Sequence, residues 1–182
     1  MGAAMKRAWL LAVLVLAGSS VLRAQEPVDR WTWELQGGYN TPSGWLDSGW
    51  MAQTGIGYAW TDHLSVVLHG TYYQGNLKGI SGSNALYTLT LAPELRRSVS
   101  AHGEVYVFLG AGVAGTYSYY WGRGWQRIHV PSQTKWAGEA GIGYRHFFSR
   151  GVGMSFQVTY THMAFDPSVD VGDGRVGLVV RF

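Results

Sequence analysis

The stretch DGRVGLVVRF, residues Asp173–Phe182, decides the fold of this chain. Alternate positions form an apolar face that comprises Val176, Leu178, Val180 and Phe182. The opposite face carries two cations, Arg175 and Arg181. Alternation with a period of two is the signature of a β-strand. A strand with an apolar and a charged face predicts a sheet closed into a transmembrane barrel, whose apolar surface contacts lipid. The alternative is an edge strand of a soluble β-sandwich.

The N-terminal segment has the pattern of a secretory signal peptide. Lys6 and Arg7 precede the apolar run Ala8–Ala17, which is too short to cross a bilayer as a helix. We expect residues 1–24 to be removed and residues 25–182 to form one mature domain. Leu22 is larger than the usual residue at its position before the cleavage site, so cleavage after Ala24 is fixed only to within a few residues.

The composition narrows the class of protein. Three of the 14 Lys and Arg residues lie in the leader, which leaves 11 bases against 11 acids and a mature net charge of zero. A neutral chain does not favour nucleic acid as a partner. The absence of cysteine excludes disulfides and cysteine metal sites. The 26 Gly, 11 Tyr and 9 Trp residues suit strands that bend and that carry interfacial rings.

The chain contains eight segments with the same alternation as the last one, each near the length of a tilted transmembrane strand. They are Trp31–Asn40, Trp50–Trp60, Leu64–Tyr73, Ala85–Arg96, Glu104–Ala114, Lys135–His146, Gly151–Ala164 and Asp173–Phe182. The connections between them alternate between short and long. Such alternation is typical of barrels with short periplasmic turns and longer extracellular loops.

Aromatic residues on the apolar faces fall at two heights. An outer group contains Tyr39, Trp50, Tyr72, Tyr87, Trp136 and Tyr160. An inner group contains Trp31, Trp60, Tyr144 and Phe182, and Leu, Val, Ile and Ala lie between the groups. Two aromatic girdles around an apolar band are expected of a membrane barrel. The sequence therefore predicts an all-β fold, an eight-stranded antiparallel transmembrane β-barrel.

At the level of these patterns the chain resembles the OmpA/OmpX-like family of small outer-membrane barrels. The resemblance rests on the glycine-rich strands Tyr106–Gly115 and Trp136–His146 and on a last strand that ends in Phe182. It implies insertion into the outer membrane by the barrel assembly machinery, contact with outer-membrane lipid and lipopolysaccharide, and a monomeric state. From the sequence itself we expect no periplasmic domain after the last strand.

Charged residues on the inward faces predict a polar lumen. They are Glu34, Glu94, Arg96, Glu104, Lys135, Glu139, Arg145, Arg175 and Arg181. Four acids nearly balance five bases, and the interior of an eight-stranded barrel has room for little besides its side chains. We expect an ion-pair network that plugs the lumen, with Glu34 and Arg181 paired at the closing seam and His69 joining the network. A narrow polar passage is the alternative.

Some eight-stranded barrels modify lipid A, and His162 is placed like the catalytic histidine of the lipid A deacylase family. That family has a His-x-Ser arrangement, whereas this chain has Ala164 at the serine position. Ser168 is the nearest replacement, and it follows Pro167 in a loop. A triad needs its nucleophile within hydrogen-bond reach of the base. We therefore expect no enzymatic activity, no cofactor and no metal site.

The segment Gly115–Thr134 is the most distinctive loop. Its rings and cations favour recognition of a protein, a glycan or a phosphate. The candidate binding residues are Tyr119, Tyr120, Trp121, Arg123, Trp125 and Arg127. The alternative is a hairpin that extends the strands above the membrane. The sequence thus predicts a non-enzymatic envelope protein with a structural or surface-binding role, and the other candidates are a lipid A-modifying hydrolase and a small pore or carrier of hydrophobic molecules.

Overall fold

The computed structural model describes residues 30–43, 46–76, 82–121, 127–130 and 133–182. The predicted signal peptide, residues 1–24, lies outside this part of the chain. None of the described residues belongs to a helix long and apolar enough to cross a bilayer. The strands are β1 (Trp31–Pro42), β2 (Gly49–Ala59), β3 (Leu64–Asn76), β4 (Gly82–Ser98), β5 (Gly103–Trp121), β6 (Arg127–Val130), β7 (Thr134–Phe147), β8 (Val152–Met163) and β9 (Val169–Arg181).

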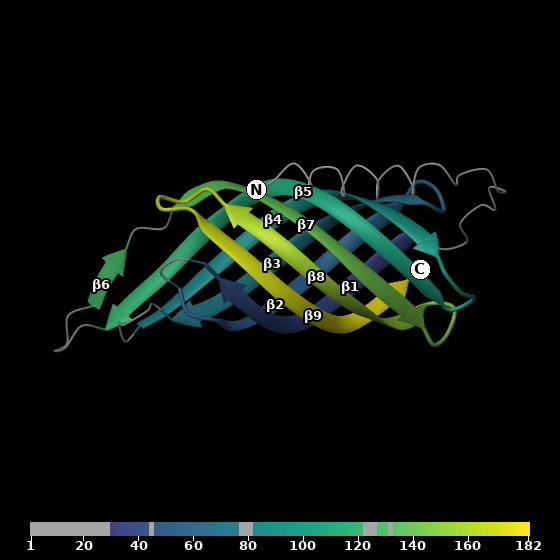
Figure 1. Ribbon diagram of the computed structural model, residues 1–182, viewed down its shortest axis with the longest axis horizontal. Helices are drawn as coiled ribbons and strands as arrows, with labels where there is room; N and C mark the ends of the chain where they lie inside the picture. Colours follow the sequence, from purple (N-terminus) through teal and green to yellow (C-terminus); the bar gives the residue numbers. More distant parts are fainter. Residues whose placement is uncertain (1–29, 44–45, 77–81, 122–126, 131–132) are drawn as a thin grey trace, which may run out of the picture.

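Eight of these strands close into a tilted antiparallel barrel (Figure 1). Neighbours in sequence pair around the barrel, with β5 next to β7, and the last strand β9 returns to β1. This seam runs from the pair Thr32 and Arg181 to the pair Pro42 and Val171. The predicted eight-stranded barrel is confirmed. Closure leaves the barrel strands without an open edge, which is what a sheet within lipid requires.

The exposed residues reproduce the predicted lipid-facing surface. Rings of the outer girdle lie side by side on neighbouring strands, and those of Trp50 and Tyr72 are 5.4 Å apart. Trp31 and Phe182 are exposed at the other end. Between the girdles the exposed side chains are aliphatic and include Leu35, Ile56, Leu68, Leu91, Leu109, Ile142, Val158 and Leu178.

The strands on the extracellular side are longer than the sequence indicates. β3 and β4 stay paired as far as Asn76 and Ser83, so residues 74–76 and 82–84, which lie between two of the predicted strand segments, belong to strands. β4 and β5 remain paired as far as Gly82 and Tyr120. The short β6 then pairs with β5 and extends beyond the barrel at the end opposite the C-terminus (Figure 1). The alternative of a hairpin above the membrane thus describes the backbone of this region.

Two inward glycines make room for aromatic side chains in the lumen. A Cβ atom on Gly143 would lie 2.2 Å from the Tyr106 ring, and one on Gly141 would lie 2.5 Å from the Phe108 ring. The rings of Tyr106 and Phe108 stack at 6.3 Å and are both buried. These rings therefore occupy the space that a side chain at either glycine of β7 would need.

Candidate functional site

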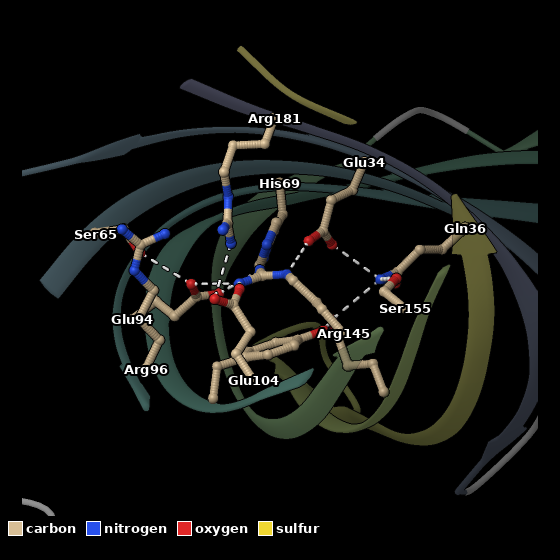
Figure 2. Close-up of polar contacts among 12 residues, drawn as sticks. Glu34, Gln36, Ser65, His69, Glu94, Arg96, Glu104, Arg145, Ser155 and Arg181 are labelled. Atoms are coloured by element: carbon tan, nitrogen blue, oxygen red, sulfur yellow. Dashed lines mark hydrogen bonds and ion pairs between the residues drawn. The ribbon is translucent and has the colours of Figure 1, made fainter. Parts of the chain in front are cut away.

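Arg145 on β7 is the centre of the polar lumen (Figure 2). Its guanidinium group donates hydrogen bonds to carboxylates from three other strands. Nη1 and Nη2 reach the two oxygens of Glu94 at 2.8 and 2.7 Å, Nη1 also reaches Glu104 at 3.1 Å, and Nε donates to Glu34. The cation lies 3.8 Å from the centre of the Tyr106 ring. This arrangement ties β1, β4, β5 and β7 together across the lumen.

Two further cations, Arg181 and Arg96, complete the network around Arg145. Arg181 donates to the second oxygen of Glu104 at 2.8 Å. Arg96 is buried and donates to the backbone carbonyls of Thr61 and Asp62 at 3.2 Å. Three bases therefore accompany three acids, and burial of these charges is compensated. The predicted seam pair needs correction: Glu34 binds Arg145, whereas Arg181 binds Glu104, because the side chain of Arg145 reaches across the lumen to the seam strand.

A second polar group lies nearer the middle of the barrel. His69 Nδ1 is 2.5 Å from Glu139 Oε1, and Thr90 donates to the same oxygen at 2.7 Å. Arg175 binds Asp173 through Nε and Nη2 at 2.5 and 2.8 Å. Asp173, the first residue of the predicted last strand, was not among the predicted members of the network, but it is a buried partner of Arg175. Its inward period-two position, two residues from Arg175, was the signal available in the sequence.

The extracellular end of the lumen is apolar. A cluster of buried side chains closes it: Leu46, Met51, Tyr73, Leu86, Ala114, Ala137, Met163, Phe165, Val169 and Val171. The sequence analysis did not predict this cluster, although the lumen-facing residues of several strands become apolar towards that end. Lys135 needs correction as a member of the lumen network. It is exposed at the second position of β7, outside the closed lumen, where its charge remains hydrated.

The lumen as a whole is built to hold side chains. Charged groups fill its periplasmic half and apolar groups seal its extracellular end. No group of three or more metal-binding side chains occurs among the residues described. Such an interior holds the strands together.

A separate cluster surrounds His162 on the outer surface of the barrel, near the extracellular rim. His162 Nδ1 lies 2.7 Å from Asp170 Oδ1, and the Tyr160 hydroxyl donates to the same oxygen at 2.7 Å. The Trp136 ring packs 5.3 Å from the imidazole. Asp170 is fixed in turn by its backbone, because Ser43 N donates to its carbonyl at 2.7 Å. The carboxylate therefore orients an imidazole that stays about one-third exposed.

This cluster has a base and an orienting acid. Ala164 occupies the position two residues after His162, and no hydrogen bond joins Ser168 to His162 within the described chain. Ser168 is exposed in the connection before β9. Sequence reasoning found His162 but not Asp170 as its partner, because the contact depends on the pairing of β8 with β9.

The family model for the outer membrane protein beta-barrel domain matches residues 10–182. The chain belongs to this family. It is therefore an outer-membrane protein, as its girdles and closed sheet predict. No curated protein matches the sequence at a significant level.

Solved structures of small outer-membrane barrels are similar to this barrel. Neisserial surface protein A shares 18% identity with a TM-score of 0.65, over 84% of this chain and 97% of that one. Ail of Yersinia pestis shares 17% identity with a TM-score of 0.52, over 84% and 99%. OprG of Pseudomonas aeruginosa shares 14% identity with a TM-score of 0.53, over 85% and 97%. At these identities the likeness establishes the fold.

The predicted binding loop of this outer-membrane barrel lies only partly within the described residues. Tyr119, Tyr120 and Trp121 belong to β5 and pair in register with His129, Ile128 and Arg127 of β6. Arg123 and Trp125 lie outside the described residues. The backbone therefore brings the two arms of the segment into one hairpin, so that residues from both arms occupy the same extracellular projection.

Proposed function

We propose that this protein is a non-enzymatic outer-membrane barrel whose closed body supports an extracellular binding surface. The observation that carries the proposal is the filled lumen together with the long β4–β5–β6 extension. A sealed interior leaves the external surface as the part of the molecule that meets partners. The protein contacts outer-membrane lipid and lipopolysaccharide, is inserted by the barrel assembly machinery and acts as a monomer.

The chemistry of the β5–β6 segment favours an anionic ligand. Arg123 and Arg127 accompany several tyrosines and tryptophans, and arginine pairs well with phosphate or sulfate oxygens. One of the similar barrels, the attachment invasion locus protein Ail, was solved in complex with the heparin analogue sucrose octasulfate. We assign the same class of ligand here: a polyanionic glycan or the phosphates of lipopolysaccharide.

Binding measurements on the protein in lipid nanodiscs test this proposal. Sucrose octasulfate and lipopolysaccharide vesicles serve as the two probes. The double variant Arg123→Ala, Arg127→Ala should weaken binding at least tenfold, whereas Arg150→Ala in a periplasmic turn should have no effect. A ligand of phosphate type should favour the vesicles and one of sulfated-glycan type the octasulfate. Unchanged binding in the double variant would refute the assignment.

Conductance tests the sealed lumen. Purified protein in a planar bilayer should give little or no ion current. The charges in the periplasmic half of the lumen are paired, and apolar side chains pack at its extracellular end. A water-filled pore would instead expose unpaired charge of one sign to its ions. Large, steady and ion-selective openings would overturn the closed reading and support the pore alternative.

The rim cluster favours a second candidate function, hydrolysis of an outer-leaflet lipid. His162 held by Asp170 has the form of an oriented general base, and its Nε2 atom is the one that would face a reacting group. The missing nucleophile at Ala164 argues against it. Mass spectrometry of lipid A from cells with and without the protein distinguishes the two functions, and loss of an acyl chain that depends on His162 would establish the hydrolase.

A further inference from the structure

Two imidazoles and a thioether lie together on the outer surface of the barrel at its periplasmic end. They belong to His102 in the connection before β5, to His146 near the end of β7 and to Met154 near the start of β8. The turn between β7 and β8 lies at the end of the barrel that carries the C-terminus (Figure 1). This group is separate from the charged networks of the lumen and from the cluster around His162 at the opposite rim.

The two imidazole rings are close enough to bind one metal ion together. Their centres are 6.4 Å apart and their planes are inclined at 65°. A metal ion lies about 2.0–2.1 Å from an imidazole nitrogen that binds it, so one ion fits between rings at this separation. The main chain holds His102 in place, because Phe147 N donates to the His102 carbonyl at 2.7 Å.

Tyr144 and Phe148 orient the imidazole of His146. The Tyr144 hydroxyl lies 3.4 Å from His146 Nδ1, and the Phe148 ring packs 5.5 Å from the imidazole. Gly103 gives Tyr144 the space for this contact, since a Cβ atom there would lie 2.4 Å from the hydroxyl. When Nδ1 carries the proton and donates it to the Tyr144 oxygen, Nε2 has a lone pair for a metal. Histidines that bind metals generally have such a partner at the other ring nitrogen.

The neighbouring strand supplies a third donor. Met154 is the partner of His146 in the register of β7 with β8. Both residues belong to the outward-facing positions of their strands, as the exposure of Ile142, Val152 and Phe156 shows. Opposite residues on one face of an antiparallel pair have Cβ atoms about 4.5–5.5 Å apart, so the thioether is within reach of the imidazole.

We propose that His102, His146 and Met154 bind a monovalent copper ion at the periplasmic surface of the barrel. Imidazole is a general ligand for transition metals, whereas the soft thioether selects Cu(I). All three donors are neutral, so they leave the charge of the ion uncompensated at the boundary with lipid, where charge is costly to bury. A singly charged ion therefore suits this place better than Zn²⁺ or Cu²⁺. The inference goes beyond the proposed function, which needs no metal.

The sequence analysis expected no metal site because the spacing of the histidines shows none. When His, Cys, Asp and Glu alone are counted, the residues that the structure describes contain no group of three. The copper site depends on a methionine, and the pairing of β5 with β7 and of β7 with β8 brings its donors together from three segments.

Competition with the chelator bicinchoninate, without oxygen and under reducing conditions, measures the affinity for Cu(I). The protein is purified without a histidine tag and placed in lipid nanodiscs. His146→Ala and Met154→Leu should each weaken Cu(I) binding about tenfold or more. His63→Ala is the matched control, because His63 is exposed in the turn between β2 and β3, and it should leave the affinity unchanged. Equal urea unfolding midpoints for all of these proteins show that the variants are folded.

The thioether variant distinguishes a copper site from a histidine pair that binds any transition metal. Met154→Leu should leave the affinity for Zn²⁺ unchanged while it weakens the binding of Cu(I). X-ray absorption of the copper-loaded protein should show a sulfur atom bound to copper, and this signal should disappear in Met154→Leu. The proposal is overturned if the unmodified protein binds no Cu(I), if both variants bind it as tightly as the unmodified protein, or if the spectrum shows no sulfur.

Discussion

Replacement of Arg145 by methionine is the most informative perturbation of this barrel. Methionine keeps most of the side-chain volume and removes the cation that three glutamates share. Glu104 would retain Arg181, and Glu34 would retain the amide of Gln36. Among the residues that the structure describes, Glu94 would retain only the Ser65 hydroxyl at 2.9 Å. The network that Arg145 organises would then hold three acids against two bases, Arg96 and Arg181.

The expected loss follows from this uncompensated charge. Removal of one partner from a buried ion pair costs about 3–5 kcal/mol. Glu94 carries most of the loss, because its two contacts with Arg145 are the bidentate pair. The Tyr106 ring also loses the cation that lies over it. We therefore expect the free energy of unfolding of Arg145→Met to fall by about 3–5 kcal/mol.

Reversible urea unfolding in lipid vesicles, followed by tryptophan fluorescence, measures this change. Arg150→Met, in an exposed periplasmic turn, is the matched control and should change stability by less than about 0.5 kcal/mol. The double variant Arg145→Met, Glu94→Gln restores the charge balance. It should regain about 0.5–3 kcal/mol relative to the single variant. The network would not be the main stabilising interaction across the lumen if Arg145→Met lost less than about 1 kcal/mol of unfolding free energy. The same conclusion would follow if the double variant were no more stable than the single one.

Three further predictions concern other parts of the barrel. Leu109 is 69% exposed in the apolar band, so Leu109→Arg should cost about 2–4 kcal/mol in the same assay, and a neutral result would contradict its lipid-facing position. Gly143→Val should cost about 1–3 kcal/mol, because its Cβ would collide with the Tyr106 ring, whereas a Cβ on the exposed Gly174 meets no atom within 4 Å, so Gly174→Val should be tolerated. His162→Ala should leave the number of lipid A acyl chains unchanged by mass spectrometry, since Ala164 supplies no nucleophile; altered acylation would point to Ser168.

The sequence by itself determined the strands and their faces. Alternation has a period of two, so residues such as Leu109 and Glu139 are assigned to lipid or lumen without knowledge of any partner strand. The two girdles also follow from the sequence, because ring height depends only on position along each strand. The apolar closure of the lumen around Met51 and Met163 was visible in the same pattern but was not read from it.

Only the tertiary structure decided which inward groups meet. Arg145 binds glutamates from three other strands, since its long side chain crosses a narrow lumen, and sequence periodicity carries no information about that reach. The stagger of β8 against β9 likewise brings Asp170 to His162. Lys135 falls on the same set of alternate positions of β7 as the inward-facing Glu139, yet it is exposed to water. Whether a charge is enclosed depends on its height along the tilted strand as well as on the face that it occupies. Face is a local property of a strand, whereas contact across the lumen depends on register, tilt and closure of the whole sheet.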